Sequence, residues 1–114
     1  MTEQTTIDVR PPDLATARAV GERGAQLATD KAERDAPGFV ARAELTVLAK
    51  LAMGPASGED ITDHVQQQVG FKDGRCMGSV FASMHRRGLI RIVGECARRR
   101  GHGTSGGHIW ARCA

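Results

Sequence analysis

The last third of the chain, residues 71–112, constrains the fold most strongly. The spacing of its apolar residues changes from helical to strand-like at Gly88. Four apolar residues recur at positions i, i+3, i+4 and i+7 and predict one buried helix face: Met77, Val80, Phe81 and Met84. Asp73 precedes this helix as a suitable N-cap, and Gly88 follows it as a residue that tolerates positive φ. We therefore predict a helix over residues 75–87.

Two short runs rich in branched and aromatic side chains follow that helix and predict two strands. They cover residues 89–93 and His108–Arg112. The sequence between them, ECARRRGHGTSGG, contains Arg98, Arg99, Arg100 and His102 among several glycines. Such a composition cannot build a core, so this segment predicts a basic loop at the tip of a β-hairpin.

The outer face of the predicted helix carries small and cationic residues, namely Arg75, Ser79, Ala82 and Arg86. A helix with such a face, followed directly by a hairpin with a basic tip, is the arrangement of a winged helix-turn-helix domain. In that arrangement the helix enters the major groove of DNA. The hairpin, called the wing, contacts the backbone or the minor groove.

The N-terminal part begins with a predicted helix over residues 13–35. Its stripe of mainly small residues comprises Leu14, Ala17, Gly21, Ala25, Ala28 and Ala32. Small residues bury little area, so this helix would hardly stand alone. We expect it to dock either on its own domain or on a second subunit, as a dimerisation helix.

Two further helices are predicted before the basic one. The first covers about residues 41–53, and its expected buried face is Ala41, Leu45, Leu48 and Ala52, widened by Leu51. The second starts after Ser57, the expected N-cap, with Asp60 completing a capping box. Its expected inward residues are Ile61, Val65 and Val69, and its outward ones are Gln66, Gln67 and Gln68. Residues 54–57 predict a short additional strand.

This order of elements predicts a mostly α (α+β) fold. A winged-helix domain would span residues 37–114, with its wing at about residues 94–108, and residues 13–36 would form an N-terminal helical extension. Residues 1–12 lack any period and predict a disordered arm.

Positive charge is concentrated in the C-terminal part of the chain. Residues 70–114 hold nine Lys and Arg and two acidic residues, a net charge of +7, whereas residues 1–69 have a net charge of −4. A local field of this sign favours a polyanionic partner. No apolar run is long enough for a membrane helix, and the first residues are polar rather than signal-like. Three cysteines suggest free thiols in a reducing cytoplasm.

Eight residues are therefore candidate DNA contacts: Arg75, Ser79, Arg86 and Arg87 on the helix, and Arg98, Arg99, Arg100 and His102 on the wing. Arg75 is the candidate for reading guanine, because its guanidinium group can donate hydrogen bonds to O6 and N7 of that base at the same time. The outer helix face carries none of Asn, Gln and Lys, which are common base readers. We therefore do not expect sharp sequence specificity.

Other chemistries receive less support. Cys96, His102, His108 and Cys113 are zinc-binding residue types, but their spacing, C-x5-H-x5-H-x4-C, lacks the short knuckle of usual zinc sites. Trp110 is expected to fill the core rather than to stack on bases. No nucleophile–base signature or phosphate loop is present, so we expect neither catalysis nor a cofactor.

Three segments resemble small winged-helix proteins encoded by bacteriophages and prophages: DKAERDAPGFVARA, GEDITD and GLIRIVGECARRRGHGTSGGHIWAR. The resemblance covers nearly the whole chain beyond residue 20. It implies an N-terminal helical segment ahead of the winged domain, and a Gly-rich basic turn leading to a terminal Trp strand. It also implies that residues 60–68 are the first helix of the helix-turn-helix and residues 75–87 the recognition helix.

Resemblance and charge together imply a non-catalytic protein that binds double-stranded DNA in the cytoplasm of a bacterial host. Its expected role is that of a phage or prophage transcriptional regulator or replication accessory, with a homodimer as an open alternative. The rival hypothesis is a protein-binding module, such as a phage-encoded inhibitor of a host nucleoprotein of the CRISPR type. Fold alone does not decide between them.

Overall fold

A computed structural model describes residues 14–97 and 107–113, with side chains from residue 21 onward. Its elements in chain order are α1 (Leu14–Asp35), α2 (Phe39–Leu51), β1 (Ala56–Ser57), α3 (Gly58–Gln68), α4 (Cys76–Arg86), β2 (Ile90–Glu95) and β3 (His108–Arg112). The expected mostly α, α+β class is confirmed. The arm expected over residues 1–12 and the wing tip lie outside the described residues.

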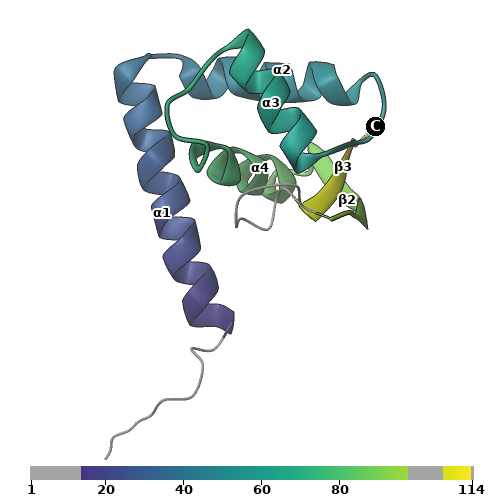
Figure 1. Cartoon of the computed structure of the whole chain (residues 1–114), viewed down its shortest axis with the longest axis horizontal. Coiled ribbons are helices and arrows are strands. Elements are labelled where there is room, and N and C mark those ends of the chain that lie inside the picture. Colours follow the sequence, from purple (N-terminus) through teal and green to yellow (C-terminus); the bar gives the residue numbers. More distant parts are fainter. Residues whose placement is uncertain (1–13, 98–106, 114) are drawn as a thin grey trace, which may run out of the picture.

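The core forms where α2, α3 and α4 meet the sheet (Figure 1). The predicted inward face of α4 is confirmed, because all four of its apolar residues are buried. Ile61 and Val65 of α3 are fully buried as well, while the three glutamines that follow are exposed. Ser57 caps α3 as predicted, since its hydroxyl accepts a hydrogen bond from the Asp60 N–H at 3.1 Å.

The prediction for α2 was wrong about which face is buried. The buried side chains are Phe39, Ala43, Val47 and Leu51, whereas Ala41 and Ala52 are exposed and Leu48 is half-buried. The two faces differ by two residues, or about 200° around a helix. Phe39 decides between them, because the helix begins at this bulky residue rather than at Ala41. Leu45 is consequently 68% exposed.

The sheet is antiparallel, and β3 lies between β1 and β2. The short strand predicted near residues 54–57 is confirmed as β1. Trp110 of β3 is the cross-strand partner of both Ala56 and Ile92. A register shift between Ile92 and Gly94 indicates a β-bulge in β2. β3 therefore holds the two outer strands together.

α1 docks on its own domain, which was one of the two arrangements left open by the sequence. Ala28 and Ala32 pack against the core. The helix extends well beyond the body of the molecule (Figure 1), and its described core contacts come from its C-terminal half. No helix in the described part of the chain is long and apolar enough to cross a membrane.

The C-terminal part of α1 is tied to the start of α2 by one carboxylate. Glu33 accepts hydrogen bonds from the backbone N–H groups of Gly38, at 2.6 Å, and Val40, at 3.0 Å. Gly38, at the N-cap position of α2, has no side chain to cap the helix, so Glu33 supplies the missing acceptor. The N–H groups of Val40 and Gly38 lower the pKa of the Glu33 carboxylate.

Glu33→Gln should lower the melting temperature at neutral pH, because an amide accepts less strongly and carries no charge. The lowered folded-state pKa means that Glu33 stabilises the fold above the ordinary pKa of 4.5, and that this contribution is lost as the pH falls through the lowered value. The two proteins should therefore melt alike in strong acid. Thermal denaturation across pH checks this, with Glu22→Gln, at an exposed position of α1, as control. Equal melting temperatures at neutral pH would contradict it.

Candidate nucleic-acid interface

The turn before α4 differs from the predicted one. The α-helix begins at Cys76, one residue after the predicted start, and Arg75 occupies the N-cap position. Tight turns precede the helix, because the N–H of Cys76 bonds to the Asp73 carbonyl and the N–H of Met77 to the Gly74 carbonyl, both at 3.1 Å. Asp73 does accept a backbone hydrogen bond, from the Arg75 N–H at 3.0 Å. It therefore caps this tight turn and not the α-helix itself.

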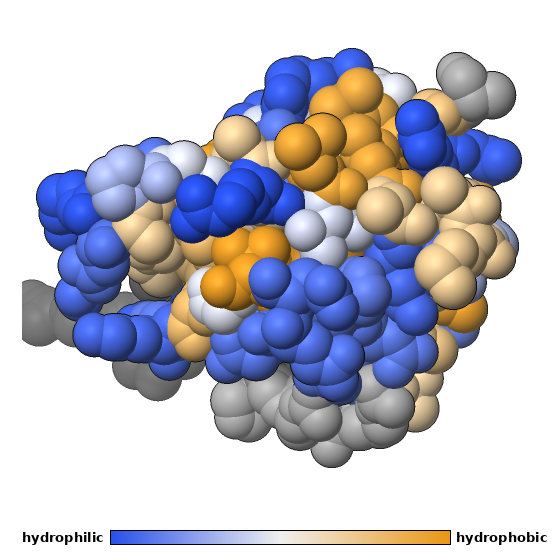
Figure 2. Space-filling view, turned by 90° about the horizontal axis from the view of Figure 1, so that it is seen from above, coloured by the Kyte–Doolittle hydropathy of each residue, from blue (hydrophilic) through white to orange (hydrophobic). Residues whose placement is uncertain are grey.

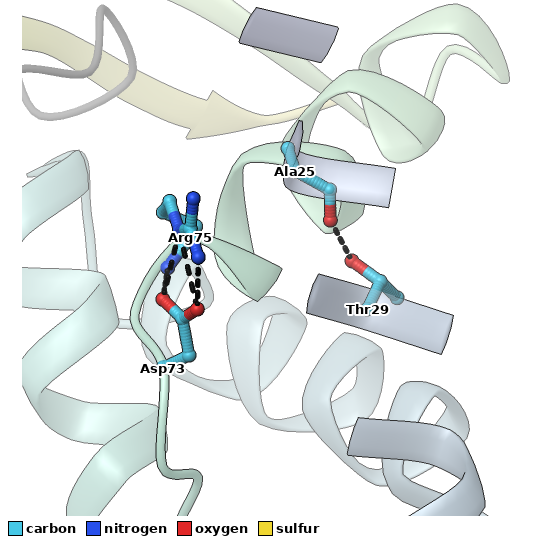
Figure 3. Close-up of polar contacts among 4 residues, drawn as sticks. All are labelled: Ala25, Thr29, Asp73 and Arg75. Atoms are coloured by element: carbon cyan, nitrogen blue, oxygen red, sulfur yellow. Dashed lines mark hydrogen bonds and ion pairs between the residues drawn. The ribbon is translucent and has the colours of Figure 1, made fainter. Parts of the chain in front are cut away.

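Arg75 is paired with Asp73 through its side chain as well (Figure 3). Its Nη2 lies 2.8 Å from Asp73 Oδ2, and its Nε lies 3.1 Å from the same oxygen. The guanidinium lowers the pKa of Asp73, and the carboxylate raises that of Arg75. The Arg75 side chain is nevertheless 72% exposed. Exposed pairs stabilise by only about 0–1 kcal/mol, so a phosphate could replace the carboxylate.

α1 crosses the outer face of α4, which the sequence analysis expected to be free for DNA. Ser79 Oγ donates to Gln26 Oε1 at 2.8 Å. A Cβ placed on Gly78 would lie 3.4 Å from the Ala25 Cβ, so the two helices are nearly in backbone contact there. Gly78 and Ser79 therefore contact α1 in this conformation, although Ser79 was predicted to contact DNA. Their small size lets a second helix approach closely.

Thr29 adds a buried polar contact to this crossing. Its hydroxyl lies 2.8 Å from the Cys76 carbonyl of α4 and 2.9 Å from the Ala25 carbonyl of its own helix (Figure 3). One hydroxyl has a single proton, so these two acceptors share it or alternate. Thr29 is 5% exposed, and both of its carbonyl partners lie where α1 meets α4. Thr29 and Gln26 are contacts that the sequence reasoning missed.

Among the residues whose side chains the structure describes, the contact between α1 and α4 consists of small groups. The methyl groups of Ala25, Ala28 and Ala32 contribute about 2 kcal/mol together at about 0.8 kcal/mol each. The two side-chain hydrogen bonds to α4 contribute about 1 kcal/mol each. Leu27, the largest apolar side chain in this part of α1, is 63% exposed and adds little.

The other end of α4 carries two arginines in different settings. Arg87 forms an ion pair with Glu44 of α2, and its Nε donates to the Ser83 carbonyl at 3.3 Å. Arg86 is exposed and lines an open hollow of about 200 Å³ between α1, α2 and α4. Asp30, Glu33 and Glu44 line the same hollow. These acids weaken the positive potential at this end of α4.

Beyond the bulge, the strands of the hairpin remain paired up to Cys96 and Gly107. Glu95 is paired with His108, and the Cys96 N–H bonds to the Gly107 carbonyl at 2.9 Å. The predicted contacts Arg98, Arg99, Arg100 and His102 lie outside the described residues, in the segment that joins these strand ends. Arg91 is paired with Ala111 and Arg112 with Ile90. Both arginines are exposed, but the alternation of the strands directs them to opposite faces of the sheet.

Trp110 fills the core as predicted, being 3% exposed. Its ring stacks on Phe81, with centroids 5.4 Å apart and planes inclined by 7°. The rings of His85 and His108 meet it edge to face. A buried ring held in this way offers no face for a nucleic-acid base.

The residues of the zinc hypothesis do not gather in the described part of the chain. No three His, Cys, Asp or Glu side chains there are placed to hold a metal ion. His108 Nδ1 instead lies 3.0 Å from a carboxylate oxygen of Glu95. Cys96 and Cys113 are half-buried and form no disulfide in the described part of the chain, and His102 lies outside the described residues.

Cys76 is a buried thiol at the start of α4. Burial and, secondarily, the nearby charge of Asp73 raise its pKa to about 11. Iodoacetamide at about pH 8 should therefore alkylate Cys96 and Cys113 well before Cys76, because the thiolate is the reactive form. Peptide mass mapping over time measures the order, and denatured protein, in which all three should react alike, is the control. Equally rapid alkylation of Cys76 in the native protein would contradict this packing.

Comparison with protein-family models, with curated proteins and with solved structures gives no match for this chain. The family resemblance noted in the sequence therefore remains an expectation. The function has to be argued from the residues of this chain.

Proposed function

We propose that this chain is a non-catalytic double-stranded DNA-binding protein with a winged helix-turn-helix domain. The observation that carries the proposal is the β2–β3 hairpin, which directly follows α4 and whose connecting segment holds Arg98, Arg99 and Arg100. The order of α2, β1, α3, α4, β2 and β3, with β3 central in the sheet, agrees with a helix-turn-helix followed by a wing.

The charges support contact with the DNA backbone more than reading of bases. Arg86 is exposed, and the ion pairs of Arg75 and Arg87 involve partly exposed side chains. Such arginines can exchange a carboxylate for a phosphate at small cost. Base reading by Arg75 and Ser79 is disfavoured in this conformation, because α1 occupies the adjoining helix face. The proposal is therefore binding dominated by phosphates, with modest sequence preference.

In a phage or prophage, as the sequence resemblance implies, such a protein would act as a transcriptional regulator or replication accessory. Backbone-dominated binding suits both roles, since either can use non-specific affinity to reach its site. The candidate contacts remain Arg75, Ser79, Arg86, Arg87, Arg98, Arg99, Arg100 and His102.

A mobility-shift titration with random duplex DNA tests the proposal. If about five phosphates are contacted, the logarithm of the binding constant should fall with the logarithm of salt concentration at a slope of about −4 to −5. Replacing Arg98, Arg99 and Arg100 together by Ala should reduce the magnitude of that slope by about 3 and abolish the shift at moderate salt.

The matched control removes the same charge from exposed positions of α1, with Ala at Arg23, Lys31 and Arg34. This control should retain most of the affinity, because the proposed interface is local. Absence of a shift at low salt would contradict DNA binding. An equal loss in both triple variants would show that only the net charge matters.

The exposed side of α2 favours a second candidate, a protein-binding module such as an inhibitor of a host nucleoprotein. Leu45 and Met53 are 68% and 82% exposed, and Ala41, Ala49 and Ala52 are exposed beside them. Hydrophobic residues reach the surface on the face that includes α2 (Figure 2). Grouped apolar side chains of this kind mark interaction surfaces. No DNA shift at low salt, together with capture of a host nucleoprotein that Leu45→Ser abolishes, would favour this candidate.

A further inference from the structure

We propose that α1 is a displaceable cover over the DNA-facing side of α4, closed in the free protein and moved aside when DNA binds. This inference rests on the proposed function, because it concerns regulation of the same site. It starts from the crossing of the two helices, where Ala25 and Gly78 are in close contact and Gln26 bonds to Ser79. These α4 residues lie on the face that a recognition helix presents to DNA.

The sizes of the groups show that the closed arrangement obstructs the groove. A helix with its side chains is about 10–12 Å across. The major groove is about 12 Å wide and accommodates a single helix. α4 therefore cannot enter the groove along the face that α1 covers. Only the end of α4 near Arg86, and the hairpin beyond it, remain accessible.

The contact has the properties of one that can open. In the part of α1 whose side chains are described, it buries three alanine methyl groups and two side-chain hydrogen bonds to α4. Gln26 and Ser79 are partly in solvent, where water can replace their bond. The end of α1 is fixed more firmly, because Glu33 holds the backbone of Gly38 and Val40. Gly38 has a positive φ of 89°, and the short connection around it would serve as the pivot.

The charge on α1 makes the open form the better binding partner for DNA. Asp30 on α1 lines the hollow beside Arg86, together with Glu44 of α2. When α1 moves aside, the carboxylate of Asp30 leaves this hollow. The electrostatic potential around Arg86 then becomes more positive, and the Ser79 hydroxyl no longer bonds to Gln26. DNA therefore interacts more favourably with the open state than with the closed one, which is the condition for a ligand to shift such an equilibrium.

A reversible disulfide between α1 and α4 tests the proposal on the full chain. The Cβ built on Gly78 lies 3.4 Å from that of Ala25. Disulfides join Cβ atoms about 3.5–4.5 Å apart, so a small shift accommodates the bond. Ala25→Cys and Gly78→Cys are combined with Cys96→Ser and Cys113→Ser to prevent other pairings. The affinity for a 20-base-pair duplex, about two turns of DNA, is measured in the oxidised and reduced forms of the same protein.

The oxidised form should bind DNA about tenfold or more weakly than the reduced form, because the open state, in which α4 adds its contacts to those of the hairpin, is no longer populated. Equal affinity in the two forms, or failure of the disulfide to form, would overturn the proposal. The parent with only the two Ser substitutions is the control for oxidation. If that parent does not bind DNA at all, the proposed function itself fails, which is a separate result.

A loosened variant provides the converse measurement. Gln26→Ala with Thr29→Val removes both polar contacts from the α1 side and leaves every proposed DNA contact unchanged. This variant should bind the duplex more tightly than the parent, with Glu22→Ala as an exposed control on the same helix. Binding no tighter than the parent, in a variant whose amide exchange on α1 is faster, would contradict a cover that competes with DNA.

Discussion

The stacked contact between Trp110 and Phe81 holds the sheet against α4, and the arrangement of the C-terminal half depends on it. Trp110 lies on the central strand, with Ala56 on one side and Ile92 on the other. One aromatic pair therefore positions the whole sheet relative to the helix. Such pairs contribute about 0.5–1.5 kcal/mol beyond the area they bury, and the stack also fixes an orientation. The base of the basic hairpin is consequently directed by a core contact rather than by the loop itself.

Large apolar side chains at clear helical spacing made α3 and α4 predictable. Bulky residues such as Phe81 and Met84 leave few alternative orientations of a helix. The free energy gained by burying them exceeds the differences in helix propensity between residues. The same reasoning failed for α2, whose sequence contains two apolar sets of equal period on nearly opposite faces. Leu45 and Leu48, with Leu51 at their side, suggested one face, whereas Leu51 is buried together with Val47 on the other. Phe39 settled the choice, but its role depends on where the helix begins, and boundaries are the weakest part of a sequence-based prediction.

The outer face of α4 shows a different limit. Small residues such as Gly78 and Ser79 allow close approach by any partner, whether a DNA groove or another helix. The small residues of α1 had indicated a need for a docking surface, but nothing in the sequence paired that stripe with this face. Ser79 and Gln26 are 53 residues apart, and no sequence motif marks either of them as a contact between helices. The candidate residues could therefore be named from the sequence, while their accessibility required the tertiary structure.

Arg75 and Arg87 have a partner in the free protein and would exchange it for phosphates in the proposed complex with DNA. Asp73 holds Arg75 and Glu44 holds Arg87 as ion pairs within the protein. In water such pairs stabilise little, whereas a row of phosphates offers many acceptors and releases counterions on contact. On the proposed function, the phosphates would therefore replace Asp73 and Glu44 as partners of these arginines. In the proposed complex, charge alone does not select among the DNA contacts, and the position of α1 over α4 decides which of them can form.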